Sequence, residues 1–203
     1  MGGYGRQKMS EKSQRKKNLI IEKARQVFSE KGFRTVTMKD IVEACEISRG
    51  GLYLYFDSTE SLFKEVLKTE SEEAEDDVFE KAVSGKMTSA EILALFLKEQ
   101  KKEILKKEGA LTMAIYEFYF ATKLSKRDNI LRRQFDEAVL VIEKLIADGV
   151  ENGEFYCEDA KGAARNIMYV LEGLKIRSQT VGISAGEVNH EIMYIMRGLV
   201  GEE

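Results

Sequence analysis

Proline and tryptophan are absent from this 203-residue chain, which also has one histidine and only two cysteines. Because proline is the residue that most strongly interrupts a helix interior, its absence favours long helices. Cys45 and Cys157 form no C-x-x-C pair and are too few for a disulfide framework or a structural zinc site. We expect both to be buried thiols in a reducing compartment. No metal site and no cofactor are predicted.

Long apolar runs are also missing. No stretch approaches the roughly 18 apolar residues that a membrane span needs. The first ten residues lack the apolar segment of a signal peptide. The composition, 43% hydrophobic and 33% charged, is typical of a globular chain. We therefore expect a cytoplasmic protein of one or two domains with no membrane partner.

The charge is divided unevenly along the chain. Residues 1–68 carry a balance of +5, whereas the remaining residues carry −8, and together they give the net charge of −3. A basic head on an acidic body indicates that only the head meets a polyanion. The acidic run over residues 70–80 is interpreted as a solvated helix face. A metal site is the alternative, supported only by the number of carboxylates.

Apolar residues recur at helical spacing along the chain, without strand-like alternation, which predicts an all-α fold. Gly32 is the expected left-handed end of the first long helix. Thr37 and Asp40 form a capping-box pattern, and Ser48 and Ser58 are expected N-caps. The predicted helices cover about 14–31, 37–45, 48–56, 58–83, 89–104, 113–120, 126–151, 159–180 and 186–200.

The strongest pattern lies between residues 37 and 62. A short helix with Ile41, Ala44 and Cys45 facing inward is followed by a turn and a second short helix that Ser48 opens. Gly50 and Gly51 each cost up to about 1 kcal/mol of helix propensity. Without side chains, they allow that helix to approach DNA bases closely. These features are typical of a helix-turn-helix whose second helix enters the major groove.

The same segment resembles the TetR family of transcriptional repressors. The matching runs are Phe28-Ser29-Glu30-Lys31-Gly32-Phe33, Thr37-x-x-x-Ile41, Ser48-Arg49-Gly50-x-Leu52-Tyr53-x-Tyr55-Phe56 and Glu60-x-Leu62-Phe63. The resemblance implies an all-α homodimer with a three-helix helix-turn-helix DNA-binding domain joined to a larger helical ligand-binding and dimerisation domain. On this basis we expect a disordered basic arm at 1–12, the DNA-binding domain at 13–57 and the second domain at 58–203. The helix at about 58–83 would be the connector.

The resemblance also assigns roles at the DNA. Thr37, Tyr53 and Tyr55 would contact phosphates, whereas Arg49 and Gly50 would face base edges. The chemistry agrees, because arginine pairs with guanine through two hydrogen bonds and hydroxyls suit phosphates. Packing within the small domain is the alternative for either tyrosine. The expected DNA-contacting set is Thr37, Lys39, Ser48, Arg49, Gly50, Gly51, Tyr53, Leu54, Tyr55 and Thr59.

Two positions depart from the family pattern. Thr59 stands where many members have a lysine that grips a phosphate, and Glu46 stands where many have glycine in the turn before the recognition helix. The first weakens one expected backbone contact, and the second indicates a different turn. The basic segment 15–17, with Lys12, either adds phosphate contacts or only solvates the N-terminus.

The second domain is similar to the family subtype that includes regulators of choline and betaine metabolism. Tyr116-Glu117-Phe118-Tyr119-Phe120 and Gly149-x-x-x-Gly153-Glu154-Phe155 carry this resemblance. Members build their ligand site inside the helical bundle, although aromatic and methionine side chains at this spacing are more often core than pocket. The expected ligand-binding set is Phe96, Met113, Tyr116, Glu117, Phe120, Phe135, Val139, Met168 and Leu171.

Glu117 is the notable member of that set. A carboxylate among aromatic residues is costly to bury unpaired, so we interpret it as a counter-charge for a mainly apolar, cationic ligand. The alternative is an exposed or salt-bridged glutamate. An uncharged ligand would need the aromatic face but not the carboxylate.

The last two predicted helices carry more apolar surface than one chain easily buries, which predicts a homodimer through a four-helix bundle. The expected interface residues are Ile167, Leu174, Val188, Ile192, Ile195, Met196 and Leu199. The resulting hypothesis is a dimeric repressor on a pseudo-palindromic, double-stranded operator that a small-molecule effector releases. A structural DNA-binding protein without a ligand and a small-molecule enzyme are the rival hypotheses.

Overall fold

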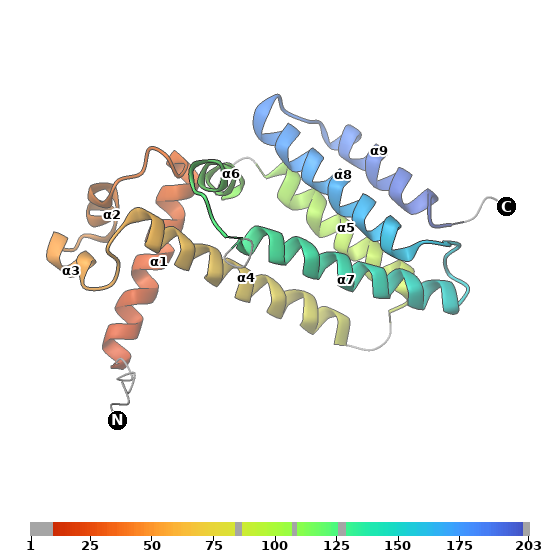
Figure 1. Ribbon diagram of the computed structural model, residues 1–203, viewed down its shortest axis with the longest axis horizontal. Helices are drawn as coiled ribbons and strands as arrows, with labels where there is room; N and C mark the ends of the chain where they lie inside the picture. Colours follow the sequence, from red (N-terminus) through yellow and green to blue (C-terminus); the bar gives the residue numbers. More distant parts are fainter. Residues whose placement is uncertain (1–9, 84–86, 107–108, 126–128, 201–203) are drawn as a thin grey trace.

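The computed structural model describes residues 10–83, 87–106, 109–125 and 129–200, except for the side chains of residues 72–83 (Figure 1). Every regular element in this part of the chain is an α-helix, which confirms the all-α prediction. The helices are α1 (Glu11–Lys31), α2 (Met38–Cys45), α3 (Arg49–Tyr53), α4 (Thr59–Val83), α5 (Ser89–Leu105), α6 (Thr112–Ala121), α7 (Ile130–Glu151), α8 (Ala160–Thr180) and α9 (Ala185–Arg197).

The helices form two groups, as Figure 1 shows. The first group contains α1, α2 and α3 at the N-terminal end, and the second contains α5, α7, α8 and α9 at the other end. α6 lies between the groups, and α4 packs against both α1 and α7. Two helices therefore link the groups, where the sequence predicted only the α4 segment.

Polar caps set most helix ends. Thr37 accepts a hydrogen bond from the backbone N–H of Asp40, whose side chain accepts one from the N–H of Thr37, which completes the predicted capping box. Ser48 accepts from the N–H of Gly51 at 3.1 Å. Gly32 ends α1 with a φ of +78°, a left-handed value that favours glycine. The boundaries that depend on these residues agree with the prediction.

Other boundaries differ by a few residues. α1 begins at Glu11 because Ser10 caps it, so the last two residues of the predicted arm are helical and residues 1–9 lie outside the description. α7 begins at Ile130, after the cap Asn129, rather than near residue 126, and residues 126–128 are not described. α9 begins at Ala185, one residue early, because Ser184 and Glu187 form a capping box that the sequence reading missed.

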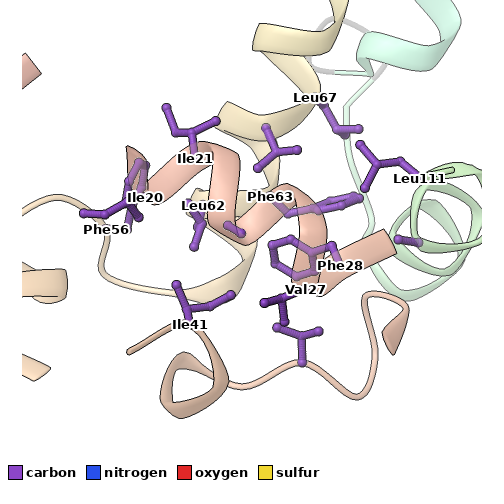
Figure 2. Close-up of a cluster of buried hydrophobic side chains, with 14 of the residues drawn as sticks. Ile20, Ile21, Val27, Phe28, Ile41, Phe56, Leu62, Phe63, Leu67 and Leu111 are labelled. Carbon is purple, nitrogen blue, oxygen red and sulfur yellow. The ribbon is translucent and has the colours of Figure 1, made fainter. Parts of the chain in front are cut away.

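The first group of helices shares an aromatic core with α4 and α6 (Figure 2). Phe28, Phe63 and Phe118 are fully buried, although they come from α1, α4 and α6. The ring centroids of Phe28 and Phe63 lie 4.7 Å apart, and those of Phe63 and Phe118 lie 5.1 Å apart. Burying one such side chain contributes on the order of 2–3 kcal/mol. α6 is therefore anchored in the core of the N-terminal group.

The second core joins α5, α7, α8 and α9 and is largely aliphatic. Leu93, Leu97, Ile146, Leu171 and Val188 are fully buried there. Phe155 follows α7 and packs where a side chain at position 149 would otherwise stand, since an added Cβ on Gly149 would lie 2.3 Å from its ring. Gly149 therefore allows the end of α7 to close over this core.

The two cysteines differ in burial. Cys45 is a buried free thiol, and desolvation raises its pKa. Cys157 is also free but only partly buried, so the prediction of two buried thiols is wrong for this residue. Cys157 lies in the irregular segment between α7 and α8 and packs against the edge of the second core. Across the described residues, no helix is long and apolar enough to span a membrane.

Candidate DNA-binding surface and effector site

α2 and α3 form the predicted helix-turn-helix. Ile41 on α2 and Leu52 on α3 are completely buried in the aromatic core and fix the two helices to α1 and α4. Between the helices, Glu46 adopts a left-handed conformation with φ +52°. A residue with a side chain pays about 1–2 kcal/mol for this conformation. The turn therefore has a conformation that favours glycine, although Glu46 occupies it.

The predicted DNA-contacting residues lie at one end of the molecule and are mainly exposed. The exposed members are Thr37, Lys39, Ser48, Arg49, Gly50, Tyr53 and Leu54, and the partly buried members are Gly51, Tyr55 and Thr59. Leu54, with 83% of its surface exposed, has no core to serve in this chain. An exposed leucine beside a recognition helix suits apolar contact with a thymine methyl group.

Three of these side chains are also held within the protein. The guanidinium of Arg49 lies 5.5 Å from the centroid of the Tyr53 ring, a cation–π contact across one turn of α3. The hydroxyl of Tyr55 lies 3.2 Å from the Ser13 hydroxyl on α1. The packing alternative thus gains support at Tyr55, whereas the Tyr53 hydroxyl has no such partner among the described side chains.

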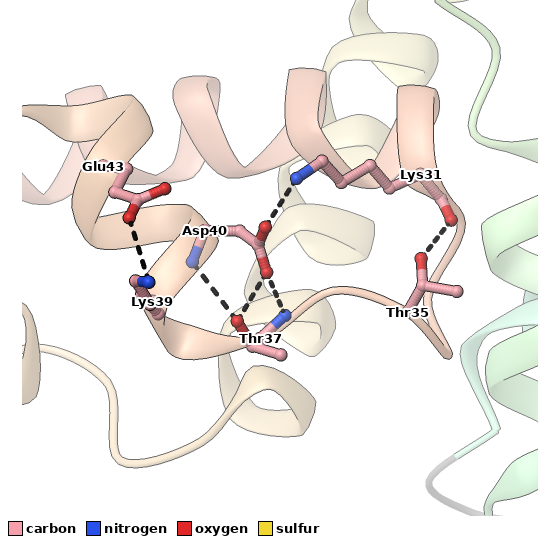
Figure 3. Close-up of polar contacts among 6 residues, drawn as sticks. All are labelled: Lys31, Thr35, Thr37, Lys39, Asp40 and Glu43. Carbon is pink, nitrogen blue, oxygen red and sulfur yellow. Dashed lines mark hydrogen bonds and ion pairs between the residues drawn. The ribbon is translucent and has the colours of Figure 1, made fainter.

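A network of polar contacts fixes the turn between α1 and α2 (Figure 3). The Lys31 ammonium donates to Asp40 Oδ1 at 2.5 Å, and the Thr35 hydroxyl donates to the Lys31 carbonyl at 2.5 Å. The hydrogen bond from Lys31, followed by those from Thr37, holds the pKa of Asp40 well below its usual value. The Thr37 hydroxyl also donates to Asp40 Oδ2 at 2.5 Å, so it would have to give up this hydrogen bond in order to donate to a phosphate.

The basic segment at the start of α1 divides into three different environments. Lys17 donates to Glu65 Oε1 at 2.5 Å and lies 5.9 Å from the Phe56 ring centroid, so it holds α1 to α4. Arg15 lies 3.9 Å from Glu11 on the surface. Lys16 Nζ instead lies 3.7 Å from the position of a Cβ added to Gly51, beside the first turn of α3. Lys16 is thus the cation of this segment placed next to the recognition helix.

The predicted ligand-binding residues do not form one cluster. Phe96, Phe135, Val139, Met168 and Leu171 belong to the second core or pack against it. Met113 and Phe120 on α6 are exposed, Phe120 by 84%. The prediction that Phe120 lines an internal site is wrong in this structure, because α6 turns its other side toward the aromatic core. The i, i+4 spacing from Tyr116 could not reveal which neighbour α6 faces.

Glu117 also lies elsewhere than expected. Its Oε2 accepts a hydrogen bond from the backbone N–H of Arg34 at 3.0 Å, in the turn between α1 and α2. It is half-buried against Gly32 rather than placed within the second core. The carboxylate thus has a hydrogen-bond partner within the chain, and this position does not support the interpretation as a ligand counter-charge. The neighbouring Tyr116 donates from its hydroxyl to Glu172 Oε2 on α8 at 2.9 Å.

One oxygen of a different carboxylate has no hydrogen-bond partner among the described residues. Oε2 of Glu143 on α7 is buried and accepts no hydrogen bond in the described structure. Glu143 follows the buried Val139 by one turn, so it lies at the edge of the face that α7 turns toward the second core. A buried carboxylate oxygen without a donor is costly and calls for an explanation. Sequence spacing gave no signal for it, because α7 carries several other acidic residues.

Two hollows open to solvent occur on the second group of helices. One of about 540 Å³ is lined by α5 residues that include Lys98, Lys101 and Lys102. The other, of about 590 Å³, lies between α8 and α9 and includes Gly173, Ile183 and the exposed His190. Leu174 lines the second hollow, but no residue of the predicted ligand-binding set lines either one.

Most of the predicted dimer-interface residues are buried within one chain. Ile167, Leu174, Val188, Ile195 and Leu199 belong to the second core, and Ile192 and Met196 pack against it. At most 9% of the surface of each of these five residues is exposed, so the core of the same chain takes up most of the apolar surface that the prediction assigned to a partner. The regular apolar stripe of α9 faces its own bundle. The exposed apolar side chains of these helices are Tyr169, Ile176, Met193 and Tyr194.

Comparison with known proteins agrees with this architecture. Residues 20–66 match the family model "Bacterial regulatory proteins, tetR family", and residues 92–189 match "Tetracyclin repressor-like, C-terminal domain". The uncharacterized HTH-type transcriptional regulator YfiR of Bacillus subtilis (strain 168) is 32% identical over 139 residues, which cover 67% of this chain and 66% of YfiR, just under two thirds of it.

More distant matches span more of the chain. The HTH-type transcriptional regulator QacR of Staphylococcus aureus (strain Mu50) is 25% identical over 160 residues, 78% of this chain and 83% of QacR. A transcriptional regulator from Saccharomonospora viridis, solved in complex with choline, shares the fold with a TM-score of 0.79 at 18% identity, over 93% of this chain and 100% of that one. With matches in both its helix-turn-helix and its C-terminal helices, this chain belongs to the TetR family of DNA-binding transcriptional regulators.

Proposed function

We propose that this regulator is a dimeric repressor that binds a pseudo-palindromic operator and is released by a small lipophilic effector. The observation that carries the proposal is the exposed end of the helix-turn-helix, where Arg49 on α3 is flanked by Lys16 on α1. Selection of bound duplexes from a random pool tests it. A consensus with two-fold symmetry is expected, because a symmetric dimer places two recognition helices on related half-sites. Recovery of no consensus would contradict operator recognition.

Lys16 would contribute a phosphate contact from outside the recognition helix. Each phosphate contact adds about 0.9 to the slope of log K against log salt, so Lys16→Ala should lower the slope of a dimer by roughly 2. Lys161→Ala, at an exposed lysine on α8, is the matched control. A slope identical in the Lys16 variant and the parent would show that this lysine only solvates α1.

The dimer interface would use the outer faces of α8 and α9. Tyr169 and Ile176 on α8, with Met193 and Tyr194 on α9, place exposed apolar surface on neighbouring helices. Met193→Asp should produce a 23 kDa species in sedimentation at micromolar concentration, because a charge in an apolar interface is desolvated without a partner. Leu140→Asp, at a leucine of α7 that is 61% exposed, should leave the dimer intact. A monomer in Leu140→Asp together with a dimer in Met193→Asp would instead indicate that the interface uses α7.

The effector would carry a positive charge, and Glu143 rather than Glu117 would be its counter-charge. The support is the buried Glu143 oxygen without a donor, next to the core that holds Val139 and Leu171. The choline bound to the Saccharomonospora viridis regulator is likewise a cation, in keeping with the choline and betaine subtype. An ammonium ion on this oxygen would supply the missing electrostatic partner.

Release from the selected operator tests the charge. Alkyl trimethylammonium ions and neutral branched alcohols of equal length are titrated against the complex. The parent should respond more strongly to the cations, and Glu143→Gln should lose that preference. Glu137→Gln, at an exposed glutamate of α7, is the control. If the cations and the alcohols released the parent equally well, the charge of the effector would not matter, and a neutral lipophilic effector would be favoured. A complex that no compound releases would favour a DNA-binding protein without a ligand.

Release itself would follow from a population shift. The effector must bind better to the conformation in which the two recognition helices are wrongly spaced for the operator. α4 is suited to transmit this difference, because it packs against α1 in the first group and α7 in the second.

A further inference from the structure

Glu117 joins α6 to the turn that leads into the helix-turn-helix. Its Oε2 accepts the Arg34 N–H at 3.0 Å, across 83 residues of sequence. The same oxygen would lie 2.6 Å from a Cβ on Gly32, a separation that real Cβ atoms do not show. Glycine at position 32 therefore both allows the φ of +78° and leaves space for the Glu117 carboxylate. The backbone of this turn thus accommodates the contact with Glu117.

The turn that Glu117 holds is rigidly connected to α2. Lys31 is tied to Asp40 and Thr35 to Lys31, and Asp40 in turn caps α2 together with Thr37 (Figure 3). These bonds surround Arg34 on both sides along the chain. A displacement at Arg34 would therefore move α2, and the recognition helix α3 packed against it, rather than bend the turn.

The other polar contacts of α6 reach the second group of helices. Tyr116, the residue before Glu117, donates to Glu172 on α8, and Glu172 also accepts from Lys175 at 3.2 Å. The Tyr119 hydroxyl accepts from the N–H of Leu131 on α7 at 2.9 Å. Neighbouring residues of one short helix thus bind α8, the α1–α2 turn and α7. The phenol of Tyr116 stays protonated at neutral pH, since burial raises its pKa, and it remains a donor.

We infer that Glu117 is a positioning residue for DNA recognition, through which the placement of α6 on α7 and α8 sets the position of α2 and α3. The inference rests on the proposed operator binding. It requires that operator affinity depend on the hydrogen bond that Glu117 accepts, rather than on the charge or volume of its side chain. It also requires that a substitution at Tyr116 change operator affinity only while Glu117 accepts the hydrogen bond from Arg34.

A double-mutant cycle on operator affinity tests both requirements, with the operator that the parent selects from a random duplex pool. Glu117→Met keeps the volume but removes the acceptor, and should weaken operator binding at least five-fold without changing the salt slope. Glu117→Gln retains an acceptor oxygen and should bind within two-fold of the parent. Tyr116→Phe should change affinity at least three-fold in the parent but not in the Glu117→Met background.

Glu137→Met, at an exposed glutamate of α7, should behave as the parent. Unchanged affinity in Glu117→Met, or an equal effect of Tyr116→Phe in both backgrounds, would overturn the inference. Should Glu117→Met not fold, NMR amide exchange of Arg34 in Tyr116→Phe replaces the cycle. Exchange several-fold faster than in the parent supports the coupling, and unchanged exchange overturns it. A parent that selects no duplex sequence instead defeats the proposed function, and the exchange measurement still reports on the contact between α6 and the turn.

Discussion

The two helical groups bury their cores in different ways. The N-terminal core stacks phenylalanine rings from α1, α4 and α6, and a polar network closes the turn above it. The C-terminal core is mainly aliphatic, and its one buried acceptor without a donor among the described side chains is an oxygen of Glu143. Ring stacking and fully paired polar groups specify one arrangement, whereas aliphatic contacts tolerate repacking. We therefore expect the first group to hold a fixed surface and the second group to repack more readily.

The largest expected effect tests whether α6 belongs to the N-terminal core. Phe118→Ala should destabilise the protein by about 3–5 kcal/mol, the usual cost of deleting a buried phenylalanine. Phe118 is fully buried and its ring centroid lies 4.9 Å from that of Phe33. Phe120→Ala, two residues along the same helix but 84% exposed, should stay within about 0.5 kcal/mol of the parent. Urea unfolding measures both, and equal losses would remove α6 from that core.

The second prediction sharpens the contrast at the DNA surface. Arg49→Ala should cost about 1–3 kcal/mol of discrimination between the operator and scrambled DNA, since it would remove the proposed base contact. Tyr53→Phe keeps the ring beside Arg49 and should weaken both complexes evenly. The two affinities are measured at one fixed salt concentration. An unchanged ratio in Arg49→Ala would show that Arg49 does not read bases.

The third prediction concerns the strained turn of the N-terminal group. Glu46→Gly should raise the free energy of unfolding by about 1 kcal/mol, because Glu46 adopts φ +52° and glycine does so without strain. Glu43→Gly, three residues earlier and inside α2, should lower it by a similar amount through lost helix propensity. Thermal unfolding of both variants shows whether each substitution raises or lowers stability. A loss of stability in Glu46→Gly would show that the Glu46 side chain supports the turn.

The smallest effect is expected from the acidic cap of α2. The pKa of Asp40 is lowered in the folded protein, so its contribution to stability is present above about pH 4 and is lost as the pH falls through the folded pKa. Asp40→Asn should therefore lower the melting temperature at pH 7, and the difference from the parent should shrink below pH 4. Lys31→Met removes the largest cause of the lowered pKa of Asp40. In that background, the melting temperature should depend less on pH between 7 and 2.5. A constant difference from pH 7 to pH 2.5 would contradict this linkage.

The sequence predicted the N-terminal group more completely than the C-terminal group, for a physical reason. Caps such as Thr37 and Ser48 act within three residues, and the recognition surface lies on two consecutive short helices, so local patterns describe both. The direction of Glu117 and the orphan oxygen of Glu143 depend on packing between helices distant in sequence. Helical periodicity showed that α9 has an apolar stripe, but not whether the stripe faces its own chain or a partner.

The burial of Phe118 also bears on how this regulator could be recombined with others. A chimera that joins residues 1–68 to the sensing domain of another family member would leave Phe33 and Phe63 without the ring that now packs on both. The boundary that preserves these ring contacts is discontinuous along the chain. It places residues 112–121 with the N-terminal group of helices rather than with the C-terminal group. Exchanging the C-terminal domain of this regulator thus requires that residues 1–68 and 112–121 stay together, and a single cut after residue 68 would separate α6 from the core that it packs in.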